Sequence, residues 1–206
     1  MISINEFFAL WSRMHGDAKI TGIVRTWLVI SYKIAKLLSR LKFTPNKLTF
    51  LGLVFGVLLF IYAQSPWAPI LLIFSLICDG VDGSLAIFTS ATTRWGAILD
   101  SIIDRITEFF WILAIYKIGA DERLLLVVVV IASIQEYTRA RAGGLGMQQV
   151  GVVTFAERPV RASFIFTTFI AYAMSLSIIN QLVIIWLLLQ LISFFMIIRF
   201  IYLKLS

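Results

Sequence analysis

Four aspartates form two pairs in one stretch of the chain, Asp79 with Asp82 and Asp100 with Asp104. On a helix with 100° per residue, the members of the first pair are about 60° apart and those of the second about 40° apart, so each pair shares a helix face. Carboxylates gathered at one place repel one another and take up protons unless cations neutralise them. Carboxylate oxygens are the ligands that Mg²⁺ and Mn²⁺ favour, so the pattern predicts a site for two divalent ions.

Other kinds of metal site are excluded by composition. His15 is the only histidine and Cys78 the only cysteine, so this chain alone cannot build a Cys/His zinc site, an iron–sulfur cluster or a disulfide. Two oxygen-bound ions would clamp a phosphate during a displacement reaction. Small residues follow the first aspartate pair and precede or lie within the second, and they would let two helices approach closely beside a phosphate: Gly83, Ala86, Ser90, Gly96, Ala97 and Ser101.

The composition is that of a membrane protein. Of the 206 residues, 60% are hydrophobic and 14% are charged, which is more apolar side chain than a soluble fold of this size can bury. The length suits a single domain over 1–206. The net charge of +7 suits anionic lipid head groups or a phosphorylated substrate, and we expect no nucleic-acid partner.

Six transmembrane helices follow from the lengths of the apolar runs. The uncharged run from Leu48 to Cys78 would extend about 46 Å as a helix, which exceeds a hydrocarbon core about 30 Å thick. It must therefore fold back near Gln64-Ser65-Pro66. The spans are expected at about 48–63, 67–88, 95–119, 124–142, 162–175 and 181–202, within a bundle over about 46–204. This count places the aspartates inside helices.

The segment at about 20–42 is predicted to be an amphipathic helix in the membrane surface. Its apolar residues keep helical spacing, and its basic residues lie near the opposite stripe. A short span over 27–38 is the alternative, but Lys33 and Lys36 would lie near its centre. The first residues do not follow a signal-peptide pattern. If the N-terminus is inside, all 18 basic residues except Lys117 and Arg123 lie on the inner side.

The aspartate motif resembles a known family signature. Asp79-x2-Asp82-Gly83-x2-Ala86 followed by Gly96-x3-Asp100-x3-Asp104 is similar to the signature of the CDP-alcohol phosphotransferases. Four segments extend the resemblance, and the last three resemble the actinobacterial phosphatidylinositol phosphate synthases: Thr44-Pro45-Asn46, Thr93 to Asp100, Tyr137 to Ala142, and Glu157 to Arg161. The resemblance implies an all-α integral membrane fold, six transmembrane helices preceded by a surface helix, in a homodimer in the bacterial cytoplasmic membrane.

The resemblance also implies a reaction and its residues. A phosphatidyl group would pass from CDP-diacylglycerol to a small polyol, releasing CMP on the cytoplasmic side. Asp79, Asp82 and Asp100 would hold one ion, Asp79, Asp100 and Asp104 the other, and Asp104 would also be the general base. The expected donor-binding residues are Asn46, Thr49, Gly83, Ala86 and Gly96. Five arginines expected on the inner side could bind a phosphate on the acceptor: Arg94, Arg139, Arg141, Arg158 and Arg161. Glu136 and Glu157 are expected to orient these arginines.

Three positions depart from the family pattern. Ile87 replaces an arginine after the motif alanine, Arg139 a lysine and Gly143 a glutamate. If Ile87 faces the donor, Ile87→Arg should tighten CDP-lipid binding. Inositol phosphate is the first acceptor to consider, and glycerol 3-phosphate is the second. The alternative class is an inactive paralogue or an ion- or proton-handling membrane protein, which would not release CMP in the presence of Mn²⁺.

Overall fold

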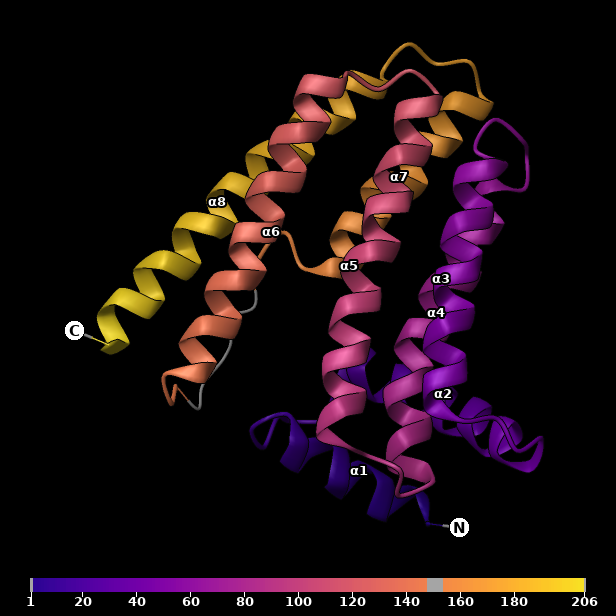
Figure 1. Ribbon diagram of the computed structural model, residues 1–206, viewed down its shortest axis with the longest axis vertical. Helices are drawn as coiled ribbons and strands as arrows, with labels where there is room; N and C mark the ends of the chain where they lie inside the picture. The colour runs from indigo at the N-terminus through magenta and orange to yellow at the C-terminus, as the bar shows by residue number, and fades with distance from the viewer. Residues whose placement is uncertain (1, 148–153, 206) are drawn as a thin grey trace. The chain divides into compact units, whose positions relative to one another are not determined.

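A computed structural model describes residues 2–147 and 154–205, and these residues form eight helices and no strand (Figure 1). The bounds are α1 Ile4–Met14, α2 Gly22–Arg40, α3 Pro45–Ile61, α4 Ala68–Phe88, α5 Arg94–Lys117, α6 Glu122–Gly144, α7 Arg158–Ala173 and α8 Ile179–Leu205. Helices α3 to α8 correspond one by one to the six apolar segments predicted from the sequence. Helix α2 covers most of the segment predicted as a surface helix.

Two of these helices can cross a membrane by their length and composition. They are α4 and α8, with mean hydropathies of 2.0 and 2.5. Helices α2 and α3 pass the same test only together, and they are bent by 109° at the break between them. The described residues therefore offer two spanning helices, or three if the bent pair is one span. Helix α5 carries the second aspartate pair with other charged residues, which lowers its mean hydropathy.

Helix α1 was not predicted, although its start carries a recognisable signal. The backbone N–H of Ser3 donates to Oε2 of Glu6 at 2.7 Å, and the backbone N–H of Glu6 donates to Oγ of Ser3 at 3.3 Å. This reciprocal capping box satisfies two N–H groups that the first helical turn leaves without partners. A serine followed three residues later by glutamate could therefore have located the start of α1.

The chain divides into two compact units. The first comprises the chain up to Val57 together with Ile73–Thr107, and the second comprises Leu58–Leu72 together with the chain from Glu108 onward. The first unit thus contains α1, α2, most of α3 and the halves of α4 and α5 that carry the four aspartates. The second contains α6, α7 and α8.

The core of the first unit joins α2 and α3 to the aspartate-bearing half of α4. One buried cluster consists of Ala35, Leu48, Cys78, Val81, Leu85 and Phe88. Thr44 precedes α3 and Pro45 is its first residue, a position that suits proline because the missing N–H would have no helical partner. This packing holds the carboxylate pair of α4 beside the start of α3.

The position of Ile87 corrects the prediction made for it. Ile87 is 4% exposed and packs in a second buried cluster with Phe7 of α1 and Leu28 of α2. It therefore faces the N-terminal helices, and the expectation that it faces the donor is wrong. The spacing of the motif could not reveal this, because α1 was not predicted and no sequence pattern links Phe7 to Ile87.

Ile87→Arg is now expected to destabilise the protein without tightening the binding of a CDP-lipid. A longer, charged side chain cannot fit between Phe7 and Leu28 without displacing α1, and overpacking of this kind costs about 1–3 kcal/mol before the cost of the buried charge. The thermal midpoint of the detergent-solubilised chain measures the loss, with Ile87→Leu as the volume-matched control. A stable Ile87→Arg protein that binds CDP more tightly would restore the original prediction.

The second unit contains a buried amide pair between α6 and α8, which run side by side (Figure 1). Nε2 of Gln190 donates to Oε1 of Gln135 at 2.7 Å, and both side chains are 0% exposed. Phe164 of α7 stacks on Trp186 of α8 with 6.4 Å between ring centroids. Polar side chains that bond across helices in this way hold neighbouring membrane helices in one register.

Candidate metal centre and active site

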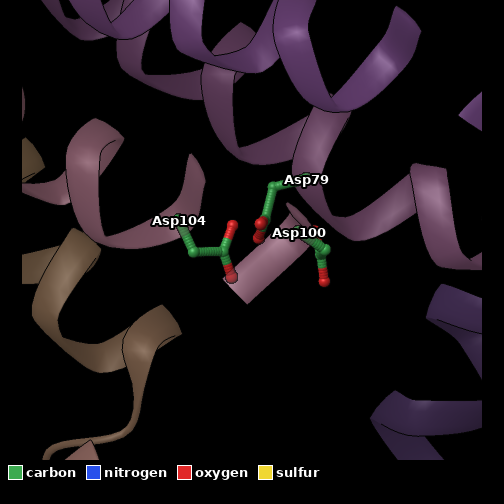
Figure 2. A group of neighbouring side chains, drawn as sticks. All are labelled: Asp79, Asp100 and Asp104. Atoms are coloured by element: carbon green, nitrogen blue, oxygen red, sulfur yellow. The ribbon is translucent and has the colours of Figure 1, made fainter. Parts of the chain in front are cut away.

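Three of the four predicted metal ligands lie together. Asp79 of α4 and Asp100 and Asp104 of α5 each offer one carboxylate oxygen, and these oxygens lie within 4.8 Å of one another (Figure 2). All three residues are half-buried. Three anionic oxygens at this separation repel one another, and a divalent cation between them removes the repulsion. The donor set, made only of oxygen, fits Mg²⁺ or Mn²⁺.

Asp82 lies next to this group but has other partners. Its side chain is 5% exposed, Oγ1 of Thr49 donates to Oδ2 at 2.6 Å, and the backbone N–H of Gly83 donates to Oδ1 at 2.6 Å. Both carboxylate oxygens of Asp82 therefore accept protein hydrogen bonds. The structure brings together three of the four aspartates and orients the fourth through α3.

The residues predicted to bind the donor all belong to the first unit. Thr49 contacts Asp82 through the hydrogen bond just described. A Cβ placed on Gly96 would lie 3.7 Å from Oδ1 of Asn46 and 2.9 Å from Oγ1 of Thr93, so the first turns of α3 and α5 meet at this glycine. A Cβ placed on Gly83 would contact nothing within 4 Å. The helix surface at Gly83 is therefore open, and Ala86 follows it on the same helix.

Two of the five predicted phosphate-binding arginines form ion pairs in the second unit. Nη1 and Nη2 of Arg139 donate to the two carboxylate oxygens of Glu157 at 2.9 and 2.6 Å. Arg161 pairs with Glu108 through its Nε at 2.5 Å and with Glu136 through Nη1 at 3.3 Å, and its Nη1 also donates to the carbonyl of Ala156. The prediction that Glu136 and Glu157 orient arginines is confirmed. The pairing of Glu108 with Arg161 was missed, because 53 residues separate them in the sequence.

The exposure of the five arginines differs sharply. Arg161 is 0% exposed, so its guanidinium presents no surface to a ligand. Arg141 and Arg94 are exposed, and Arg139 is half-buried. The half-buried Arg158 places its guanidinium carbon 5.2 Å from the centre of the Trp111 ring, a cation–π contact. Arg94 belongs to the first unit and the other four to the second.

The loop before α7 is held by the Glu157 carboxylate. Burial raises the pKa of this carboxyl, but hydrogen bonds from Arg139 and from the backbone and hydroxyl of Thr154 outweigh burial and leave the pKa below its ordinary value. The carboxylate is therefore charged at neutral pH. It joins α6 to the residues that lead into α7, next to Arg158.

The fold resembles that of a solved membrane enzyme. Phosphatidylinositol phosphate synthase from Mycobacterium tuberculosis is 23% identical in sequence and superposes with a TM-score of 0.67. The match covers 84% of this chain and 94% of the solved chain in the structure with CDP-DAG bound, and 88% of the solved chain in the structure with manganese and citrate. This similarity confirms the all-helical fold.

Two relatives have a higher sequence identity over a smaller part of the chain. Phosphatidylinositol phosphate synthase from Cutibacterium acnes is 31% identical over 147 residues, which is 64% of this chain and 70% of that protein. The enzyme of the same name from Corynebacterium glutamicum is 34% identical over 147 residues, or 65% of each chain. The chain thus matches about two thirds of the length of these relatives.

The family assignment rests on the aspartate motif and on a match that extends far beyond it. The family model described as CDP-alcohol phosphatidyltransferase matches residues 42–201, from the residue before Phe43 to the last turns of α8. This range includes all four aspartates and every predicted donor- and acceptor-binding residue. The chain therefore belongs to the CDP-alcohol phosphatidyltransferase family.

Proposed function

We propose that this protein transfers a phosphatidyl group from CDP-diacylglycerol to inositol phosphate and releases CMP. The observation that carries the proposal is the group of three carboxylates from the family motif, Asp79, Asp100 and Asp104. Two facts about similar proteins support the choice of substrates. Both characterised relatives are phosphatidylinositol phosphate synthases, and the solved enzyme of similar fold was determined with CDP-DAG bound.

Asp79, Asp100 and Asp104 would hold Mg²⁺ or Mn²⁺, and Asp82 would complete the ligands of a second ion. Divalent ions bound there would neutralise the donor diphosphate and stabilise the charge that develops during transfer. A divalent ion fits this cluster because the ligand atoms are carboxylate oxygens, lie within 4.8 Å of one another and are partly buried. The hydrogen bond from Thr49 keeps Asp82 oriented, which is how residues around a metal site fix its ligands.

The protein itself would supply the base and the room for the donor. Asp104 would accept the proton of an acceptor hydroxyl, whose oxygen attacks the phosphorus on the lipid side. A phosphorus–oxygen bond to the acceptor forms as the bond to CMP breaks, and CMP leaves with the electron pair. The open helix surface at Gly83, with Ala86 on the same helix and Asn46 beside Gly96, would accommodate the nucleotide and its diphosphate.

In the second unit, Arg139, Arg141 and Arg158 would bind the acceptor phosphate, and Arg94 is the corresponding candidate in the first unit. Guanidinium groups bind phosphate through parallel hydrogen bonds, and three of these four residues surround the end of α6 and the start of α7. Arg161 would serve this site indirectly. Because Arg161 is 0% exposed and pairs with Glu108 and Glu136, we assign it to fixing α7 against α6 instead of to contact with the phosphate.

We further propose the topology implied by the sequence. Helices α3 to α8 would form a six-span bundle in the bacterial cytoplasmic membrane, within a single domain and a homodimer, and α2 would lie in the membrane surface. Basic residues support a cytoplasmic active site, since all but Lys117 and Arg123 fall on one side in this arrangement. Exposed apolar residues on α2, Ile23 at 89% and Leu37 at 57% among them, support its contact with lipid.

Metal-dependent CMP release tests the proposal. The purified chain in nanodiscs is incubated with CDP-diacylglycerol, Mn²⁺ and one of three acceptors: inositol phosphate, glycerol 3-phosphate or inositol. We expect CMP release with inositol phosphate, loss of release with EDTA, and a phosphatidylinositol phosphate product by lipid mass spectrometry. CMP release with glycerol 3-phosphate and with neither inositol compound would identify glycerol 3-phosphate as the acceptor. No CMP release with any acceptor would overturn the proposed activity and favour an ion-handling or inactive protein.

A further inference from the structure

Helix α2 packs closely against the half of α4 that carries Asp79 and Asp82. Ser31 and Ala35, one turn apart on α2, are both 0% exposed, and Ser84 of α4 is 5% exposed. Oγ of Ser84 donates to Oγ of Ser31 at 3.1 Å. Small side chains in a line on both helices allow backbones to approach closely, which is the usual arrangement for tightly packed membrane helices.

One turn further along this contact, the ring of Trp27 lies directly on the backbone of Gly80. Trp27 precedes Ser31 by four residues on α2, and Gly80 precedes Ser84 by four residues on α4. A Cβ placed on Gly80 would lie 2.6 Å from Cζ2 of Trp27 and 3.4 Å from Cε2. Atoms do not approach so closely, so the indole occupies the space of the missing side chain.

Gly80 lies between the two aspartates, and its helical position needs an explanation. Glycine within a helix costs about 1 kcal/mol relative to alanine, so it is favoured there only where packing requires it. Here the packing of the Trp27 indole requires glycine, because any larger residue at position 80 would collide with the ring. The contact fixes the helix backbone directly beside Asp79, whose carboxylate joins those of Asp100 and Asp104. A shift of α4 by a fraction of an ångström would change these oxygen separations.

We propose that Trp27 is a positioning residue for the metal centre: its ring, seated on Gly80, fixes α4 at the point where Asp79 meets Asp100 and Asp104. The inference rests on the proposed function, since it assumes that the three carboxylates hold a metal. It adds a contribution from α2, which precedes the matched family region at residues 42–201. A tryptophan on an amphipathic helix could also serve only as an anchor in the membrane interface. The anchor role does not depend on Gly80, so an experiment that changes Gly80 can distinguish the anchor role from the positioning role.

The test is a pair of single variants and their double variant. Gly80→Ala adds one methyl group that collides with the indole, Trp27→Ala removes the indole, and the double variant removes the collision. Affinity for Mn²⁺ is measured on the purified full chain by the electron paramagnetic resonance signal of free Mn²⁺, without substrate. Gly80→Ala should weaken binding by about 10-fold or more, the size of effect seen when residues behind metal ligands are changed. The double variant should bind within about threefold of Trp27→Ala, because the two effects share one contact.

The matched control is Gly144→Ala near the end of α6, where an added Cβ meets nothing within 4 Å. It should bind Mn²⁺ like the wild type. Wild-type affinity in Gly80→Ala would overturn the inference, and so would a double variant whose loss of Mn²⁺ affinity is the full product of the two single losses, because additive effects mean that the two residues share no contact. Should Gly80→Ala fail to fold, Trp27→Ala decides, because weaker Mn²⁺ binding at an unchanged thermal midpoint supports positioning and unchanged binding overturns it. Absence of Mn²⁺ binding by the wild type would instead overturn the metal site of the proposed function, and this inference with it.

Discussion

Replacing Asp104 with asparagine is expected to lower CMP release by about 10²–10⁴-fold, the contribution of a positioned general base. Asparagine has nearly the same shape and keeps one oxygen toward the cluster, so part of the Mn²⁺ affinity should remain. The amide cannot accept the proton of the acceptor hydroxyl at neutral pH. Single-turnover release of CMP at saturating Mn²⁺ measures the chemical step, and free Mn²⁺ measured in parallel reports binding.

The comparison variants are Asp79→Asn and Asp100→Asn, which should lose metal-dependent binding of the CDP-lipid as well as turnover. Asp82→Asn belongs with them, although its oxygens accept hydrogen bonds from Thr49 and Gly83. If one of these three variants kept metal-dependent binding of the CDP-lipid, that aspartate would not be a metal ligand. If Asp104→Asn kept near-normal turnover, the proton would have to leave through another group.

Arg161→Met is expected to destabilise the protein by about 3–5 kcal/mol, the usual loss when one partner of a buried ion pair is removed. The Arg161 side chain is 0% exposed and lies between Glu108, 4% exposed as a residue, and Glu136. Without the guanidinium, Glu108 and Glu136 lose the cation that lies between them. Methionine retains most of the apolar stem, so the measured loss reports the charge more than the packing.

Denaturation of the detergent-solubilised chain measures this loss, and Arg141→Met is the control because Arg141 is exposed. Adding Glu108→Gln to Arg161→Met should restore part of the stability, since it removes one of the two carboxylate charges that repel each other once the guanidinium is gone. A variant with unchanged stability and a raised KM for the acceptor alone would show instead that Arg161 contacts the acceptor phosphate.

Local sequence patterns were enough to predict α2 to α8 and the helix faces that carry the four aspartates. Charge placement and run length located α3 to α8, and the spacing of Asp100 and Asp104 puts them on one face of a single helix. The meeting of Asp79 with this pair depends on how two helices cross, which helical spacing does not contain. The resemblance of the motif to a family signature supplied that information.

Contacts between distant segments could not be predicted. Helical periodicity gives the face of α4 on which Ile87 lies, but only the folded structure shows that Phe7 of α1 packs against that face. Arg161 looked like its neighbours Arg158 and Arg141, because a basic residue near a helix end has the same pattern whether it binds phosphate or a buried carboxylate. The distinction lies in its burial beside Glu108.

The buried amide pair of Gln135 and Gln190 bears on how the protein responds to bilayer thickness. Sliding α6 past α8 by one residue would separate the two amides and leave both without this partner in an apolar surrounding, at a cost of about 1–3 kcal/mol each. A mismatch with lipid thickness costs only fractions of a kcal/mol per ångström. In the proposed six-span topology, we therefore expect α6 and α8 to tilt together in thin bilayers as one rigid pair, so that the arginines at the end of α6 change depth in the membrane along with α8.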